Sequence, residues 1–377
     1  MTDPPDELRS NSDASRTGGV ADRRLLLVVG PYRSGTSLLA SILGQLGFHV
    51  PQPEVQADDS NPRGFGEPRW VVDFHQRLLR GRSVTVSDSR PAAWEIMAQT
   101  ARDDAVVKEL TSWLTVQFVG ADNVIVKDPR IGWFLPLWLR CADDLGVATS
   151  FATMLRYPPE VASSARRWYG VWQNDASRVA AWINVTLHTE QATRGARRAF
   201  VHYGDLLADW PREIARCGQL LGLPWLDEVD RSQHPRVDAL VDPNLRREAV
   251  GWDDLSIPES LQKLAEDVWR SVSLLTEPGG DDTRTQASLD ASRAAYVELY
   301  AEAEAIAQSS VRAARRRRTP ATTPARASAR NDRAEDETQL VLRIVRRIPR
   351  RYRERIPLPI RRRLLQMGRP LARAVRR

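Results

Sequence analysis

The stretch "LLLVVGPYRSGTSLLASILGQL" (residues 25–46) decides the fold. Its first five residues are apolar and predict a buried β-strand, and the apolar spacing of residues 36–46 predicts a helix. Gly30 and Gly35 bound a short turn between the two elements. Backbone N–H groups in such a turn, and those at the start of the following helix, bind anions. The stretch therefore predicts a loop that holds phosphate.

The segment from Gly30 to Ser37 has the spacing of a Walker A loop, G-x-x-x-x-G-K-[ST], but Thr36 occupies the lysine position. Arg33 supplies a cation inside the loop instead, and Ser34 adds a hydroxyl group. Hydrolysis of ATP or GTP is less favoured, because the magnesium and γ-phosphate machinery depends on that lysine. An ordinary glycine turn without a ligand is the plainer alternative.

Three more strand patterns follow, at 123–127, 148–155 and 198–203, with helical patterns between them. Strands that alternate with helices indicate a parallel sheet covered on both faces. We therefore expect an α/β fold, a three-layer parallel sheet with P-loop NTPase-like topology, plus C-terminal helices and a basic tail. Residues 51–69 predict an ordered loop. The helical patterns lie at 70–80, 92–118, 158–170, 174–194, 205–223, 257–276 and 288–308.

Charge divides the chain into two parts. The whole chain of 377 residues carries +7, but 22 arginines and five acidic residues give residues 311–377 a charge of +17, which leaves −10 for residues 1–310. Two cysteines are too few for a disulfide framework. The N-terminus is polar and no apolar run approaches the ~20 residues of a membrane span. We therefore expect a cytoplasmic protein.

Composition also predicts the domain boundaries. We expect a disordered N-terminus (1–22), a main domain (23–280), a C-terminal helix (281–312), a low-complexity linker (313–338) and an Arg-rich amphipathic tail (339–377). Basic helical pieces suit an anionic membrane at its inner face. Nucleic acid is a less favoured partner for the tail, and a solvated tail without a partner is the third interpretation. The sequence does not indicate an oligomeric state.

A second motif follows the strand pattern at 148–155. In "LRYPPEVASS" (155–164), Arg156 stands at the strand end and Ser164 lies on the next helix. An arginine fork binds phosphate through two hydrogen bonds, although a single Arg in this place is commonly a surface residue. The combination with the loop at residue 30 is more specific than either motif alone.

Together the two motifs resemble those of sulfotransferases that use 3′-phosphoadenosine 5′-phosphosulfate (PAPS). The likeness extends to "VIVKDPR" (124–130) and "VHYGDLLADW" (201–210), and it covers residues 24–250. The segments "NPRGFGE" (61–67) and "KDPR…FLPLW" resemble the bacterial, carbohydrate-type branch of that family. The resemblance implies a P-loop-like sulfotransferase fold, with PAPS as co-substrate and no metal.

The resemblance also implies which residues bind PAPS. Arg156 and Ser164 would clamp its 3′-phosphate, and Tyr203 would lie near its adenine. Lys127 would point at the sulfuryl group that is transferred. The residues that would wrap the 5′-phosphosulfate are Arg33, Ser34, Gly35, Thr36 and Ser37.

This chain departs from the family's pattern at several positions. Pro129 stands where the cytosolic branch has a catalytic histidine, and Leu38 stands where it has an adenine-stacking tryptophan. The C-terminal phosphate segment is absent, and Arg246 with Arg247 is the candidate to replace it. Arg33 stands at the position of a catalytic lysine. Its guanidinium cannot donate a proton, but it can stabilise charge on the leaving phosphate.

A base is needed to take the proton from the acceptor hydroxyl, and three residues are candidates for it. We favour Glu67, which closes "NPRGFGE", because carbohydrate sulfotransferases of this type often use a glutamate from that region. The alternative is that Glu67 caps the helix beginning near Pro68. His75 lies at helical apolar spacing, which favours packing. Asp128 beside Arg130 favours a structural ion pair.

The sequence therefore predicts an enzyme with Glu67, Arg33 and Lys127 as catalytic residues. It would move a sulfuryl group from PAPS to a hydroxyl (or amine) of a carbohydrate or glycolipid acceptor by in-line displacement. The five histidines show no metal-ligand spacing. The alternatives are a P-loop nucleotide kinase or NTPase, and a sulfotransferase-like binding protein without catalytic activity.

The chain has twelve tryptophans, and four of them fall near the predicted mouth of the sheet: Trp133, Trp138, Trp168 and Trp172. Aromatic faces suit sugar rings, so these residues are candidates for acceptor binding. Core packing is the favoured interpretation for most of them, because tryptophan buries a large apolar area.

Overall fold

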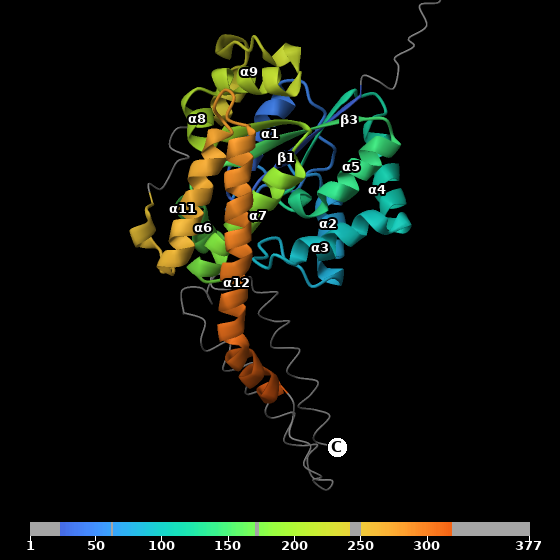
Figure 1. The fold of residues 1–377 in the computed structure, drawn as a ribbon. Coiled ribbons are helices and arrows are strands. Elements are labelled where there is room, and N and C mark those ends of the chain that lie inside the picture. Colours follow the sequence, from blue (N-terminus) through green and yellow to red (C-terminus); the bar gives the residue numbers. More distant parts are fainter. Residues whose placement is uncertain (1–22, 62, 170–172, 242–249, 319–377) are drawn as a thin grey trace, which may run out of the picture. The chain divides into compact units, whose positions relative to one another are not determined.

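Figure 1 shows the fold of the computed structural model, which describes residues 23–61, 63–169, 173–241 and 250–318. Several sequence predictions fall outside the described residues: the disordered N-terminus, the tail 339–377, Trp172, Arg246 and Arg247. The chain divides into two compact units after residue 306. The first unit holds the sheet. The described part of the second is the end of one helix, residues 307–318.

A four-stranded parallel sheet forms the centre of the first unit, in the order β2-β1-β3-β4. The two strands β1 and β2 have continuous apolar runs, residues 25–29 and 124–126, as expected where helices cover both faces. The α/β fold predicted from the sequence is confirmed, and the strand bounds agree to within one residue. The strands are β1 (Arg24–Val29), β2 (Asn123–Lys127), β3 (Ala148–Leu155) and β4 (Arg197–His202).

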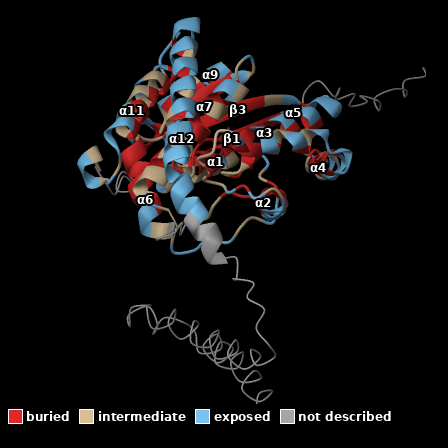
Figure 2. Cartoon of the chain, turned by 60° about the horizontal axis from the view of Figure 1, so that its bottom comes forward, coloured by how far each residue is buried: buried red, intermediate tan, exposed pale blue. Residues whose placement is uncertain are grey.

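Helices cover both faces of the sheet, which gives three layers (Figures 1 and 2). Alternate side chains of a strand point to opposite faces, so Leu25 and Leu27 join one hydrophobic cluster while Leu26 and Val28 join the other. The first cluster is completed by α2 (Arg69–Gly81), α3 (Ala93–Ala98), α4 (Asp104–Gln117) and α5 (Leu135–Asp144). The second is completed by α1 (Thr36–Gln45), α8 (Tyr203–Ala208) and α9 (Trp210–Leu221).

A third cluster forms around Leu155 of β3 and Phe200 of β4. Buried side chains from the two helices that follow β3 and from the C-terminal helices fill it. Those helices are α6 (Pro158–Tyr169), α7 (Asp175–Ala192), α11 (Glu259–Leu274) and α12 (Thr283–Arg318). A short helix, α10 (Pro235–Leu240), packs on the second cluster through Val237.

Two helices predicted as continuous are divided in the structure. The pattern at 92–118 becomes α3, a 3-10 turn and α4, because the Asp103 side chain accepts hydrogen bonds from the N–H groups of Ala105 and Val106 and starts a new helix. The pattern at 205–223 becomes α8 and α9, because Asp209 caps α9 in the same way. A cap inside an apolar pattern does not change its periodicity, so periodicity alone did not find either break.

The connections between strands define where a binding crevice can form, at the carboxyl ends of the strands. Strand β1 lies between β2 and β3, and the helices that follow β1 and β2 cover opposite faces. In such sheets a crevice opens at the carboxyl ends of the strands where the connections diverge. The loop after β1, Lys127, Arg156 and Tyr203 all follow or end their strands at this edge. The parallel topology therefore brings the predicted motifs together.

Candidate active site

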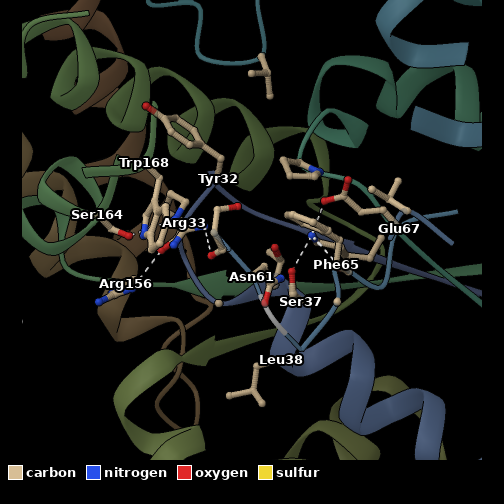
Figure 3. Close-up of a pocket in the computed structure, with 18 of the residues that line it drawn as sticks. Tyr32, Arg33, Ser37, Leu38, Asn61, Phe65, Glu67, Arg156, Ser164 and Trp168 are labelled. Atoms are coloured by element: carbon tan, nitrogen blue, oxygen red, sulfur yellow. Dashed lines mark hydrogen bonds and ion pairs between the residues drawn. The ribbon is translucent and has the colours of Figure 1, made fainter. Parts of the chain in front are cut away.

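A cavity of about 1050 Å³ opens at the carboxyl edge of the sheet (Figure 3). Its walls come from the loop after β1, the segment 55–67, the ends of β2 and β3, and helix α6. Nine of the ten site residues predicted from the sequence line it: Arg33, Gly35, Thr36, Ser37, Glu67, Lys127, Arg156, Ser164 and Tyr203.

The loop after β1 has the backbone that a phosphate cradle requires. Gly30 and Gly35 have φ values of +129° and +100°. A Cβ atom at Gly30 would lie 2.7 Å from the carbonyl oxygen of Met154, and one at Gly35 would clash with the ring of Tyr203. Arg33 also has a positive φ, +66°, although it is not a glycine. Such strain persists where the surroundings fix it and is concentrated at functional sites.

Ser34, the tenth predicted residue, holds the loop together. Its side chain is buried, and its hydroxyl donates to the carbonyl oxygen of Pro31 at 2.5 Å. Helix α1 begins just after, and the first N–H groups of a helix have no carbonyl one turn earlier. Within the part of the chain that the structure describes, the N–H groups of Gly35, Thr36 and Ser37 make no hydrogen bond. These donors are available to an anion.

Lys127 reaches the loop from the end of β2. Its Nζ atom donates to Oε1 of Glu67 at 2.6 Å, to Oγ of Ser37 at 2.9 Å and to the carbonyl oxygen of Phe65 at 3.1 Å. Only 3% of the lysine side chain and 8% of the glutamate side chain are exposed. An ammonium group has three donors, so all three are used and the charge is held in one place.

Glu67 lies at the wall of the cavity as the partner of Lys127. Burial raises the pKa of its carboxyl group above the ordinary value, while the charges of Lys127 and Arg130 oppose the shift. The start of α2 has no side-chain cap, and Oε1 of Glu67, two residues before it, accepts its hydrogen bond from Lys127 instead. Among the three base candidates, Glu67 is the one that lines the cavity.

His75 and Asp128 are buried behind that wall. Asp128 pairs with Arg130 at 2.6 Å and with Nδ1 of His75 at 2.8 Å. Burial opposes ionisation of Asp128, but Arg130 and His75 outweigh it and hold its pKa well below the usual range. Burial lowers the pKa of His75, which stays neutral at neutral pH. The ion pair expected for Asp128 and the packing expected for His75 are both present.

The other side of the cavity carries guanidinium groups (Figure 3). Nε of Arg33 donates to Oγ of Ser164 at 3.0 Å. Nε of Arg156 donates to Glu160 at 2.9 Å, and its Nη1 donates to the carbonyl oxygen of Arg33 at 3.3 Å. The Arg156 guanidinium also lies 4.7 Å from the centre of the Tyr203 ring. The structure thus joins Ser164 to the side chain of Arg33, and Arg156 to its backbone carbonyl.

The cavity is rich in positive charge. Seven cationic residues and two acidic ones, Asp58 and Glu67, line it. Residues 1–310 together carry −10, so the local charge is opposite to that of the body. A cleft of one sign raises the local concentration of ligands of the other sign. The cationic residues are Arg33, Arg63, Lys127, Arg130, Arg156, Arg167 and Arg178.

Sequence reasoning assigned no ligand to three of these cationic residues: Arg63, Arg167 and Arg178. They come from three separate segments, and arginine is common throughout the chain, so no local pattern distinguishes them. Arg167 had one signal, because it lies three residues after Ser164 on α6 and residues three apart share a helix face.

The predicted tryptophans have different surroundings. Trp133 and Trp138 are fully buried in the core, so the packing interpretation is confirmed for both. Trp168 lines the cavity, on the same side as Ser164 in Figure 3. Among the tryptophans that the structure describes, the other ten each stack on or meet another ring. For Trp168 no such ring partner is found within the described residues.

Two further findings concern only the residues that the structure describes. In them, no group of three or more His, Cys, Asp or Glu side chains is arranged to hold a metal ion. None of their helices is both long and apolar enough to cross a membrane.

Comparison with known proteins adds two structures. No protein-family model matches the chain, and no curated protein matches it significantly. The sulfotransferase domain of the Synechococcus PCC 7002 olefin synthase is similar, with a TM-score of 0.41, 18% identity, and 67% of this chain and 94% of that chain covered. The sulfotransferase domain of the curacin biosynthetic pathway has a TM-score of 0.39, 14% identity, and 67% and 98% coverage. Identity and TM-score are low, so any functional assignment rests on the geometry of the site.

Proposed function

We propose that this chain is a sulfotransferase that moves a sulfuryl group from PAPS to a hydroxyl (or amine) of a carbohydrate or glycolipid acceptor by in-line displacement. The observation that carries the proposal is the contact between the ammonium group of Lys127 and Oγ of Ser37, at 2.9 Å. In a Walker A loop the corresponding hydroxyl binds Mg²⁺. Here the Lys127 side chain supplies the cation at that hydroxyl. This favours a co-substrate whose negative charge is stabilised by protein side chains and not by Mg²⁺.

The residues of the cavity fit a nucleotide with two separate anionic groups. The N–H groups of Gly35, Thr36 and Ser37, together with Lys127, suit a 5′-phosphosulfate. On the other side of the cavity, Arg156 and Ser164 suit a 3′-phosphate, and Tyr203 suits the adenine. When bound, PAPS supplies the sulfuryl group and leaves as adenosine 3′,5′-bisphosphate.

Glu67 serves as the base in this proposal. Its Oε1 is held by Lys127 at 2.6 Å, and its Oε2 lies 4.0 Å from Arg130, beyond hydrogen-bond distance. Oε2 is therefore the oxygen that takes the proton from the acceptor. Burial raises the proton affinity of Glu67, which suits a general base that works near neutral pH.

Lys127 and Arg33 stabilise the negative charge that develops during transfer. Lys127 is fixed by three hydrogen bonds, so it needs no reorganisation when the charge appears. Arg33 remains charged throughout and cannot protonate the leaving group. The leaving phosphate is therefore stabilised as an anion.

The proposed acceptor class is supported by one aromatic residue of the cavity, Trp168. Trp168 faces the cavity without stacking on another ring of the described residues, and an aromatic face can pack against a sugar ring. This supports a carbohydrate or glycolipid acceptor. The proposed membrane surface for residues 339–377 fits a glycolipid acceptor, but those residues lie outside the described part of the chain.

Calorimetry on the full chain tests the proposal. We expect adenosine 3′,5′-bisphosphate to bind more tightly than ATP, and Arg156→Ala to weaken it. Arg77→Ala is a matched control, because Arg77 forms an exposed ion pair with Glu109 and does not line the cavity. Incubation with PAPS and a panel of glycans and glycolipids, followed by mass spectrometry, tests transfer.

Each of the other functions predicts a different result. Tighter binding of ATP in the presence of Mg²⁺ would overturn the proposal in favour of a kinase or NTPase. Tight binding of the bisphosphate with no sulfate transfer to any acceptor in the panel would favour a binding protein without catalytic activity.

A further inference from the structure

Arg130 lies between two buried carboxylates. Its Nη1 atom lies 2.6 Å from Oδ1 of Asp128 and 4.0 Å from Oε2 of Glu67. Its backbone N–H also donates to Oδ1 of Asp128, at 3.0 Å. Asp128 therefore holds the guanidinium, and Lys127 is the cation that Glu67 binds directly.

Asp128 is itself oriented by His75. The Nε1–H group of Trp138 can only donate, so Nε2 of His75 accepts its hydrogen bond, at 3.0 Å. Nδ1 of His75 consequently carries the proton and donates to Oδ2 of Asp128 at 2.8 Å. The three side chains are fully buried, and the His75 ring stacks on Phe134 with 4.4 Å between centroids. One tautomer and one ring orientation are therefore fixed.

We propose that His75 is a positioning residue that acts through Asp128 to hold Arg130 away from Glu67. The inference rests on the proposed role of Glu67 as the base. An arginine in direct contact with a carboxylate stabilises its ionised form and makes it a weaker base. With one oxygen of Asp128 on His75 and the other on Arg130, the guanidinium stays on Asp128.

Among the described residues, the charged groups with the largest effect on the Glu67 carboxyl come from β2 and the turn after it. They are Lys127, Asp128 and Arg130. Lys127 and Arg130 favour the ionised carboxylate of Glu67, and the charge of Asp128 disfavours it. Loss of the Asp128 charge therefore acts twice in the same direction: it removes a repulsion and releases Arg130 toward Glu67.

The chain contains a matched turn that serves as a control. The side chain of Arg90 donates to Asp88 at 2.9 Å and 2.7 Å, and its backbone N–H donates at 3.0 Å, as in the turn of Asp128 and Arg130. Neither Asp88 nor Arg90 lines the cavity. Asp88→Asn consequently disturbs the same kind of turn without a direct effect on Glu67.

Titration of Glu67 in the full chain tests the inference without requiring an acceptor. Glutamate labelled with ¹³C at the side-chain carboxyl reports each titration by NMR, and Glu67→Gln identifies the signal. We expect Asp128→Asn to lower the titration midpoint of Glu67 by about one pH unit or more, a tenfold change in proton affinity. Asp88→Asn leaves the midpoint unchanged. Replacement of Arg130 as well, in Asp128→Asn/Arg130→Gln, moves the Glu67 midpoint back toward the wild-type value, reversing at least part of the shift.

The role of His75 is tested by two replacements. His75→Asn keeps an N–H donor close to the position of Nδ1 and retains most of the wild-type midpoint of Glu67. His75→Leu lowers that midpoint in the same direction as Asp128→Asn. If His75→Leu does not fold, Asp128→Asn and the double variant still decide the question.

Three outcomes separate this inference from the proposed function. An unchanged Glu67 midpoint in Asp128→Asn, or an equal shift in Asp88→Asn, would overturn the inference. A shifted midpoint with no binding of adenosine 3′,5′-bisphosphate by the wild type would leave the inference standing and overturn the proposed function. In an active enzyme, the acid limb of the kcat profile shifts to lower pH in Asp128→Asn, and the bisphosphate affinity stays the same.

Discussion

The two sides of the cavity hold positive charge in different ways. At one side, Lys127 has only 3% of its side chain exposed and donates all its hydrogen bonds to Ser37, Phe65 and Glu67. At the other, Arg156 pairs with Glu160 at 2.9 Å and keeps 11% of its side chain exposed. Arg33 donates to two neutral oxygens, Oγ of Ser164 at 3.0 Å and the carbonyl of Ser60 at 3.5 Å.

This difference teaches which side suits chemistry and which suits binding. A charge that is buried and fixed stabilises a transition state well, because nothing must reorganise. Guanidinium groups that are partly exposed suit recognition of phosphate by paired hydrogen bonds, and they contribute mainly to affinity. The proposed function therefore predicts that changes at Lys127 and Glu67 affect kcat, and changes at Arg156 affect binding.

The largest effect is expected for Lys127→Ala. We expect kcat to fall about 10³-fold, the range seen when a fixed donor to a developing charge is removed. The unfolding free energy falls by about 3–5 kcal/mol, because Glu67 loses the partner of its buried charge. Denaturant unfolding checks the second effect, and Lys127→Ala/Glu67→Gln regains most of the stability without activity. The exposed Lys263→Ala is the control; an equal loss in kcat there would contradict the prediction.

The second prediction concerns Glu67 and pH. The base must be ionised, so kcat falls as the pH drops through the Glu67 pKa, which lies above the ordinary value of 4.5. In Glu67→Gln we expect kcat to be about 10²-fold lower and the acid limb to disappear. A full pH profile of both proteins measures this.

Stability changes with pH in the opposite sense for the same residue. A raised pKa means that the folded protein binds the Glu67 proton more tightly than the unfolded chain does. The contribution is therefore present below the unfolded pKa and is lost as the pH rises through the folded pKa. Glu67→Gln should gain stability relative to the wild type across that window. A constant difference across it would show that Glu67 does not titrate as inferred.

The third prediction is Arg156→Ala, at the binding side. We expect the affinity for adenosine 3′,5′-bisphosphate to fall about 10- to 100-fold, since a charge-assisted hydrogen bond contributes about 1.5–3 kcal/mol. kcat at saturating PAPS stays within a few fold of the wild type. A loss in kcat without a change in affinity would place Arg156 at the reacting side and remove the distinction between the two sides.

The smallest effect is expected for Arg33→Lys. The positive charge is retained while the hydrogen bond from Nε to Ser164 is lost. We expect activity to change by no more than about threefold if charge is what Arg33 supplies. Loss of activity as large as that in Lys127→Ala would show that the planar fork is required. Steady-state kinetics on both variants compares them directly.

Much of the fold could be read from local pattern. The apolar run at 25–29, the turn bounded by Gly30 and Gly35, and the helical spacing after it gave one strand–loop–helix unit, and the same logic gave the other strands. The caps at Asp103 and Asp209 were missed, because a single capping side chain breaks a helix without altering its apolar spacing.

The amino-acid sequence alone determined which segments end at the carboxyl edge of the sheet, and hence which residues could line a site there. Only the tertiary structure decided which of these side chains form hydrogen bonds with one another. Lys127 bonds Glu67 from 60 positions away, His75 bonds Asp128 from 53, and Arg33 bonds Ser164 from 131. Local pattern describes neighbours within a few residues, whereas these partners meet because parallel strands bring distant chain segments to one edge.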